Sequence, residues 1–187
     1  MISVLLALAV GAGPDVESFE PDDCAGCHAA LEPEVAVVFL DGSERGARVP
    51  RDALEGSIHQ DLGCVDCHPG PGPYPHPDIT HAVPRDLERA LAEGCQRCHA
   101  EVAERMRDGI HGQLGQAGHP EVATCVDCHG GHDVTTPGEP RAAISERCGR
   151  CHEEVLDTYE ASVHGAGVAE GSEATPICTS CHGAHAI

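Results

Sequence analysis

Six copies of one pattern, Cys-x-x-Cys-His, contain every cysteine of this chain. They lie at residues 24–28, 64–68, 95–99, 125–129, 148–152 and 178–182, numbered here motifs 1 to 6. In this pattern the two thiols can add to the vinyl groups of a haem, and the adjacent histidine can bind the iron. With 14 histidines in 187 residues, chance would place one after all six pairs about once in ten million sequences. The motifs therefore predict six covalently bound c-type haems.

The predicted haem-attachment residues are Cys24, Cys27, Cys64, Cys67, Cys95, Cys98, Cys125, Cys128, Cys148, Cys151, Cys178 and Cys181. The predicted proximal iron ligands are His28, His68, His99, His129, His152 and His182. Zinc is an alternative, because twelve cysteines could form three four-cysteine sites, but such sites do not require the following histidine. Disulfides fit less well, because a Cys-x-x-Cys disulfide closes a very short loop and is usually redox-active.

Eight more histidines could provide the second axial ligands. Lysine is absent and Met106 is the only methionine after the first residue, so histidine is the one abundant ligand type. We therefore expect bis-histidine ligation and, without axial methionine, low reduction potentials.

A repeat with an offset of 53 residues selects among these histidines. Counted from the first cysteine of motif 3 or 5, a histidine follows at +16, the next motif at +30 and a last histidine at +37. A looser copy precedes them, in which His81 is a rival to His76. His81 and His119 have no counterpart in the repeat, so we expect them to be ordinary surface histidines. The predicted distal ligands are His59, His76, His111, His132, His164 and His185.

His132 and His185 each follow a proximal histidine by three residues, too few for both rings to reach opposite faces of one porphyrin. We expect His132 to cap the haem of motif 3 and His185 that of motif 5. His111 and His164 are expected to cap the second haem of their own or an adjacent module.

The repeats predict three dihaem modules: module 1 at residues 13–83, module 2 at 84–139 and module 3 at 140–187. Short helices are expected at 84–93 and 140–147, each opened by proline. One more is expected along the apolar stripe Val102, Met106 and Ile110, and again at its counterpart in module 3. A small β-hairpin is predicted from strands at 35–40 and 47–49 around Asp41-Gly42. The expected fold class is mostly irregular with short α-helices around a haem core.

The composition explains why haem is needed as a core. Leu, Ile, Val and Phe supply only 36 of 187 residues, and the net charge is -20. Such a chain cannot fold by burying side chains alone, so the bound groups must replace the missing core. The acidic, lysine-free sequence argues against nucleic acid and anionic membranes as partners, and its charge could steer basic redox proteins.

Residues 1–12 are the predicted signal peptide, with Val10 and Ala12 at the -3 and -1 positions of a cleavage site. Its lack of a basic residue would be explained by a misassigned start codon. The segment is shorter than the ~20 residues that span a bilayer, and no other apolar run approaches that length. We expect a soluble exported protein, in the periplasm or outside the cell.

With these motifs the sequence resembles exported multihaem c-type cytochromes built from doubled Cys-x-x-Cys-His modules. The resemblance covers residues 24 to 185. It rests on Ser-Ile-His at 57–59, Ser-Val-His-Gly at 162–165, Val-Asp inside motifs 2 and 4, and Cys-His-Gly-x-His endings at His132 and His185. It implies electron transfer with redox proteins, a membrane quinol-oxidising cytochrome among the candidates, and assembly with other multihaem cytochromes.

The expected activity is thus electron transfer without catalysis. One alternative is a multihaem reductase of nitrite, hydroxylamine or metal oxides, whose small-molecule substrates would need an open haem position. The spare histidines argue against it, and the irregular module 1 is where we expect such a position if it exists. The other alternative is a zinc-scaffolded interaction module.

Overall fold

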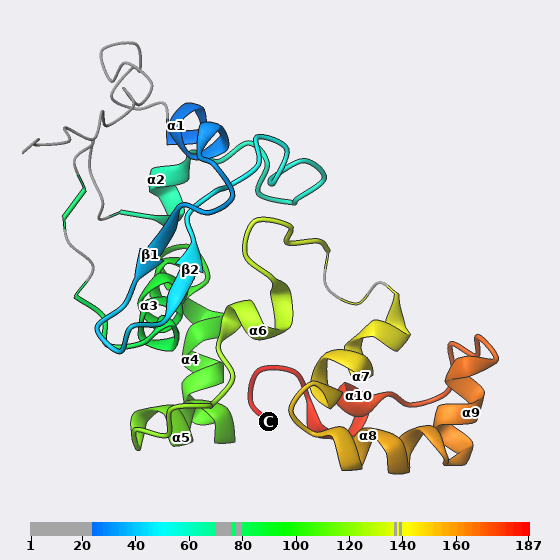
Figure 1. Cartoon of the computed structure of the whole chain (residues 1–187). Helices are drawn as coiled ribbons and strands as arrows, with labels where there is room; N and C mark the ends of the chain where they lie inside the picture. Colours follow the sequence, from blue (N-terminus) through cyan, green and yellow to red (C-terminus); the bar gives the residue numbers. More distant parts are fainter. Residues whose placement is uncertain (1–23, 70–75, 78–79, 137, 139) are drawn as a thin grey trace, which may run out of the picture.

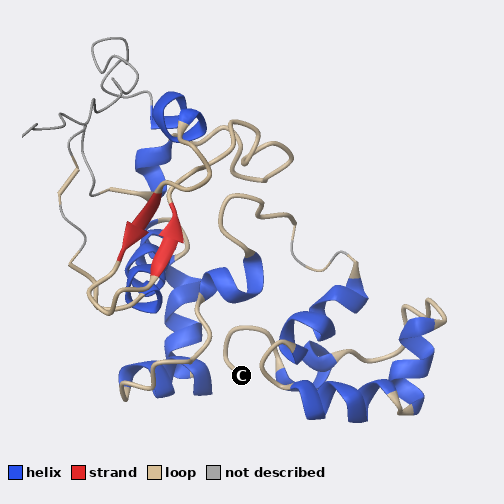
Figure 2. Ribbon diagram, in the orientation of Figure 1, coloured by secondary structure: helices blue, strands red, loops and turns tan. Residues whose placement is uncertain are grey.

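The computed structural model describes residues 24–69, 76–77, 80–136, 138 and 140–187, so the predicted signal peptide lies outside it. Short helices joined by long loops make up most of this structure, which confirms the expected fold class (Figures 1 and 2). The elements before motif 4 are α1 (Cys24–Ala30), β1 (Ala36–Val38), β2 (Glu44–Gly46), α2 (Cys64–Cys67), α3 (Pro84–Ala92), the 3-10 helix η2 (Glu93–Arg97), α4 (Ala100–Asp108) and α5 (Ile110–Gln116). Those from motif 4 onward are α6 (Cys125–His129), α7 (Arg141–Gly149), α8 (Glu153–Glu160), α9 (Val163–Ala169) and α10 (Cys178–His182). No described helix is both long and apolar enough to cross a membrane.

The predicted hairpin is present, but its second strand begins earlier than expected. β1 and β2 pair antiparallel, with Val38 opposite Glu44. The turn is tight because the Asp41 carboxylate accepts a hydrogen bond from the Ser43 amide (2.9 Å) and Gly42 takes a positive φ of 82°. The chain therefore reverses directly after Phe39 and pairs from residue 44 instead of 47.

Side-chain packing covers little apolar surface in the described part of the chain. The buried apolar residues are Phe39, Ala92 and Ile177, whereas Leu40 is 73% exposed and Val163 82% exposed. Exposed apolar side chains in such numbers indicate surfaces that something else covers. This agrees with the expectation that polypeptide alone does not supply the core.

The apolar stripe predicted one helix between motif 3 and His111, but the structure has two. α4 ends at Asp108, and the extended backbone of Gly109 (ψ 168°) turns the chain before α5. The two helices meet so closely that a Cβ on Gly112 would overlap the Met106 carbonyl oxygen. α8 and α9 repeat this arrangement, with Gly165 against the Tyr159 carbonyl oxygen. The apolar stripe predicted a single helix wrongly because its last residue, Ile110, belongs to the first turn of α5 and not to α4.

Candidate haem-binding sites

Five pairs of histidine rings lie at nearly the same separation. Each pair joins a histidine that ends a motif to one that lies outside the motifs. The distances between ring centroids are 6.1 Å for His28–His76, 6.1 Å for His59–His99, 6.1 Å for His68–His132, 6.3 Å for His111–His152 and 6.0 Å for His129–His185.

This separation fits an iron held between two imidazoles. A metal–nitrogen distance of about 2.0 Å, with about 1.1 Å from nitrogen to ring centre, places the two centroids about 6.2 Å apart. The interplanar angles range from 20° to 61°, while the distances vary by only 0.3 Å. If the rings were stacked on each other, the angle between their planes would be nearly constant. An atom bound by both rings would instead keep the distance between their centroids constant, as is found here. The donor set and its spacing therefore fit haem.

The pairs correct the expected assignment of the distal ligands. His132 lies opposite His68 of motif 2 and not His99 of motif 3, and His185 lies opposite His129 of motif 4 and not His152 of motif 5. Both do face a motif other than the one they follow. His111 faces motif 5, the first motif of module 3, where we expected a second motif.

His76, and not its rival His81, faces motif 1. His81 lies beside the hairpin, where its carbonyl accepts a hydrogen bond from the Leu40 amide (3.5 Å). His119 is exposed, and its carbonyl accepts a hydrogen bond from Arg89. The remaining part of the proline-rich stretch from Pro69 to Pro77 lies mostly outside the described residues.

A backbone joint between modules explains the new pairing. The Ile58 amide donates to the Val134 carbonyl (2.8 Å), which sets the residue before His59 against the residue two positions after His132. The two histidines therefore cross in opposite directions: His59 reaches motif 3 of module 2, and His132 reaches motif 2 of module 1. We call this arrangement a crossed joint.

A second crossed joint connects modules 2 and 3. The Ile110 amide donates to the Ile187 carbonyl (2.5 Å), so His111 reaches motif 5 and His185 reaches motif 4. Figure 1 shows the C-terminal segment leaving α10 and turning back toward the helices of module 2. A Cβ on Gly109 would lie 2.9 Å from the Ile187 nitrogen, so any side chain here, even that of alanine, would displace the C-terminal segment.

Sequence reasoning missed two arginines that support these joints. Arg97 of motif 3 donates to the Val65 carbonyl of motif 2 (3.5 Å), and Arg150 of motif 5 donates to the Asp127 carbonyl of motif 4 (3.4 Å). The two arginines are 53 residues apart, the offset of the repeat. The occurrence of arginine at the same position of both repeats was the signal in the sequence that could have identified them.

Motifs 2, 4 and 6 each form a short helix that they cap themselves. The third residue of each motif accepts a hydrogen bond from the amide just before the motif, at 2.8 Å for Asp66, 2.6 Å for Asp127 and 3.1 Å for Ser180. Asp127 also receives two hydrogen bonds from Arg85 (3.0 and 2.9 Å), which tie α3 to α6. Burial raises the pKa of the Asp127 carboxyl, but the bonds from Arg85 and Thr124 outweigh burial and leave the pKa lowered.

Motifs 3 and 5 instead lie at a junction between two helices. Cys95 lies in η2 and Cys148 near the end of α7. His99 and His152 directly precede α4 and α8 as their N-cap residues, with closely similar φ and ψ angles. The same local conformation therefore orients both proximal histidines.

Consecutive motifs are neighbours in space. His28 lies close enough to His68 to contribute to lowering the pKa of that ring. α2 contacts η2, and α7 contacts both α6 and α10. The thiols of Cys95 and Cys125 lie close enough for their interaction to lower the pKa of Cys95 and raise that of Cys125. The six motifs thus follow one another through the molecule in sequence order.

The surroundings favour neutral imidazole at three of the paired histidines. Burial, followed by the nearby His132 and His28, lowers the pKa of His68. Burial, with His185 and Arg147 next in effect, lowers the pKa of His129, and burial with Arg105 lowers that of His185. Neutral imidazole is the form that binds a metal.

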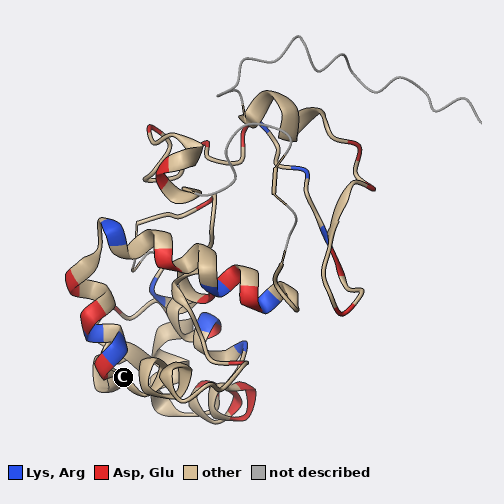
Figure 3. Ribbon diagram, turned by 90° about the vertical axis from the view of Figure 1, so that its left-hand side faces the viewer, with Lys and Arg blue, Asp and Glu red and all other residues tan. Residues whose placement is uncertain are grey.

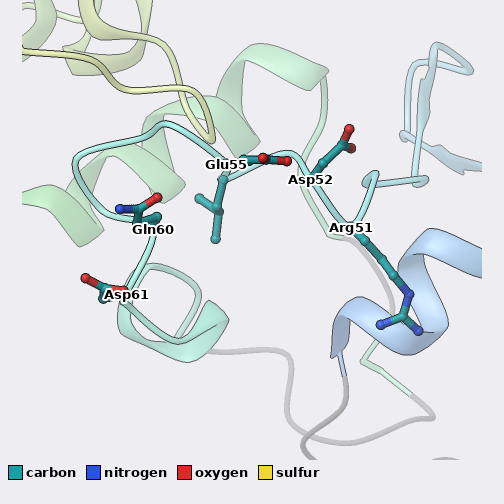
Figure 4. Close-up of a pocket in the computed structure, with 6 residues that line it drawn as sticks. Arg51, Asp52, Glu55, Gln60 and Asp61 are labelled. Atoms are coloured by element: carbon teal, nitrogen blue, oxygen red, sulfur yellow. The ribbon is translucent and has the colours of Figure 1, made fainter.

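His164 and His182 are the two predicted site histidines that make no such pair among the described residues. Both rings belong to module 3, and both residues are exposed. A surface pocket of about 490 Å³ near His59 is lined by none of the motif residues (Figure 4). Its lining residues are Arg51, Asp52, Leu54, Glu55, Gln60 and Asp61.

Comparison with family models matches residues 119–156 to the doubled CXXCH motif. The matched segment contains motifs 4 and 5, the two motifs that His185 and His111 face. No curated protein and no solved structure matches the chain. Through this segment, the chain carries the doubled CXXCH motif that marks the multihaem c-type cytochromes.

Proposed function

We propose that this chain is a hexahaem c-type cytochrome that carries electrons between redox proteins. The observation that carries the proposal is the set of five histidine pairs, each 6.0–6.3 Å apart and each containing one motif histidine. Bound haem would supply reversible one-electron chemistry. The chain's own residues would attach it through cysteines, orient it through paired imidazoles and set its potential.

The order of the motifs supports a relay. Because neighbouring motifs contact each other from motif 1 to motif 6, electrons would pass along the molecule without a mobile carrier. Bis-histidine ligation at five sites, with no axial methionine among them, favours low potentials.

The location and the partners follow from other features of the sequence. The predicted signal peptide supports export to the periplasm or the cell surface. Acidic residues are spread over the hairpin, the loops and the helices, with a net charge of -20 for the whole chain (Figure 3). That charge favours basic redox partners, with a membrane quinol-oxidising cytochrome and other multihaem cytochromes as candidates.

The test is to express the chain with the machinery that attaches c-type haem and to determine its intact mass. A mass increase of six haems, with no free thiol, is expected. The double variant Cys125→Ala, Cys128→Ala should carry one haem fewer. This result would show that motif 4 attaches one haem and that the other motifs attach theirs without it. Homogeneous protein that contains zinc, or fewer than five haems, would contradict the proposal.

A further inference from the structure

The two crossed joints follow one rule for the second motif of each module. Motif 2 of module 1 faces His132 of module 2, and motif 4 of module 2 faces His185 of module 3. In both cases the facing histidine comes from the module that follows. Motif 6 is the second motif of module 3, so by this rule its partner is not expected among the residues of module 3 itself.

Of the six predicted distal histidines, His164 is the one that makes no ring pair among the described residues. Its counterparts His59 and His111 each face the first motif of the following module. α9 packs on α8 as α5 packs on α4, through Gly165 and Gly112 respectively. His164 therefore has the orientation relative to module 3 that His111 has relative to module 2.

Local bonds fix α9 in this place. The Ser162 hydroxyl accepts hydrogen bonds from the amides of His164 (3.2 Å) and Gly165 (3.3 Å). Tyr159 at the end of α8 donates to the Pro176 carbonyl (2.8 Å), just before motif 6. With α9 held against α8 in this way, His164 makes no ring pair with His182 of motif 6, although the structure describes both residues.

The face that would receive a further module is exposed. Val163 holds the position of Ile58 and Ile110 in the two joints, and it is 82% exposed. His164 and His182 are exposed as well. Module 3 thus presents one half of a crossed joint.

We propose that the haem of motif 6 receives no second axial ligand from these 187 residues and that this position accepts a small external ligand of haem iron, neutral or anionic. This inference rests on the proposed function, because it presupposes haem at motif 6. It places an open position in module 3, whereas the sequence pointed to the irregular module 1.

The test is a carbon monoxide titration of the reduced full chain, with the haem count measured on the same sample. One carbon monoxide per six haems is expected, together with one high-spin haem among six in the oxidised protein. Six haems, all low-spin and none binding carbon monoxide, would overturn the inference and leave the proposed function intact. Absence of covalent haem would overturn both.

Variants identify the site. Cys178→Ala with Cys181→Ala should leave five haems and abolish carbon monoxide binding. His164→Ala should leave the stoichiometry at one, whereas the matched variant His111→Ala should raise it to two. Carbon monoxide binding that persists in the variant without motif 6 would show that the open position lies at another haem. If carbon monoxide binds only after His164→Ala, with none bound by the unchanged chain, His164 is itself the second ligand of motif 6 and the assignment is wrong.

Discussion

Single histidines would decide which of the proposed haem irons have two protein ligands. Ten of the 14 histidines form the five pairs, and each pair combines residues far apart in the sequence or from different modules. The local environment matches this use, because burial keeps His68, His129 and His185 neutral more readily than in water. Each pair can therefore be broken by one substitution.

His132→Ala is expected to turn one low-spin haem high-spin and to add one equivalent of bound carbon monoxide. The reason is that His132 is the ring opposite His68. Absorption and electron paramagnetic resonance spectra would measure the change. His119→Ala is the control and should leave the spectra unchanged, since His119 is exposed and lies outside the pairs.

Combining His132→Ala with the removal of one motif shows which haem loses its ligand. If motif 2 is first removed by Cys64→Ala with Cys67→Ala, His132→Ala should add no further carbon monoxide. If motif 3 is removed instead, by Cys95→Ala with Cys98→Ala, it should still add one equivalent. The opposite pattern would restore the pairing with motif 3 that the sequence suggested.

At the scale of elements, the helices serve mainly to place histidines. α5 and α9 each begin one residue before a distal candidate, and each is held against the preceding helix by a glycine. Motifs 2, 4 and 6 form self-capped helices, and motifs 3 and 5 lie at helix junctions. The joints between modules depend on close backbone contact at a few positions.

Gly109→Ala is expected to loosen the C-terminal segment and to make the haem of motif 4 high-spin. A Cβ there would lie 2.9 Å from the Ile187 nitrogen and 3.0 Å from the His185 carbonyl oxygen, although the backbone at this position suits any residue. Carbon monoxide binding should rise by one equivalent. Gly131→Ala is the matched control, because its Cβ would meet nothing within 4 Å. An equal effect of both substitutions would remove the role of the joint.

Arg85→Ala is expected to lower the free energy of unfolding by about 1–3 kcal/mol, as it removes a two-point bond to Asp127 that is partly screened by solvent. The measurement is denaturant unfolding at equal haem content. Arg45→Ala is the control: it removes an exposed pair with Glu88 and should cost less than about 1 kcal/mol. Equal losses would mean that Asp127 contributes nothing beyond a surface ion pair.

For the whole molecule, covalently attached haem with crossed histidine ligands would compensate for a sparse apolar core. Three buried apolar residues could not hold the described part of the chain together. Each joint instead exchanges two histidines between modules, so neighbouring modules would be held together by the same groups that conduct. The acidic charge remains on the outside, where it can act on approaching partners.

Electron exchange with a basic cytochrome should be at least about tenfold faster at low salt than at physiological salt, because opposite charges steer encounter over distances that salt screens beyond ~10 Å at about 0.1 M. With an acidic cytochrome the rate should be lower and should rise with salt. Stopped-flow mixing at several ionic strengths measures both. Rates independent of salt with both partners would exclude long-range steering.

The linear sequence was sufficient for several features that depend on near neighbours. Cysteine spacing identified the motifs, proline marked α3 and α7, and Asp41-Gly42 marked the hairpin turn, because each acts within a few residues. The inventory of possible ligands also needed no structure. Residue types and short spacings carry this information directly.

Tertiary structure alone decided which histidines meet. The repeat shows that His132 and His185 are equivalent, but it does not say whether they reach forward or backward. That choice is made by hydrogen bonds between Ile58 and Val134 and between Ile110 and Ile187, residues more than 70 apart. The break at Gly109 was hidden for a similar reason, because the tight contact between α4 and α5 leaves the apolar spacing of a single helix unchanged. Contacts between distant segments have no fixed spacing in the sequence, and so only the folded chain reveals them.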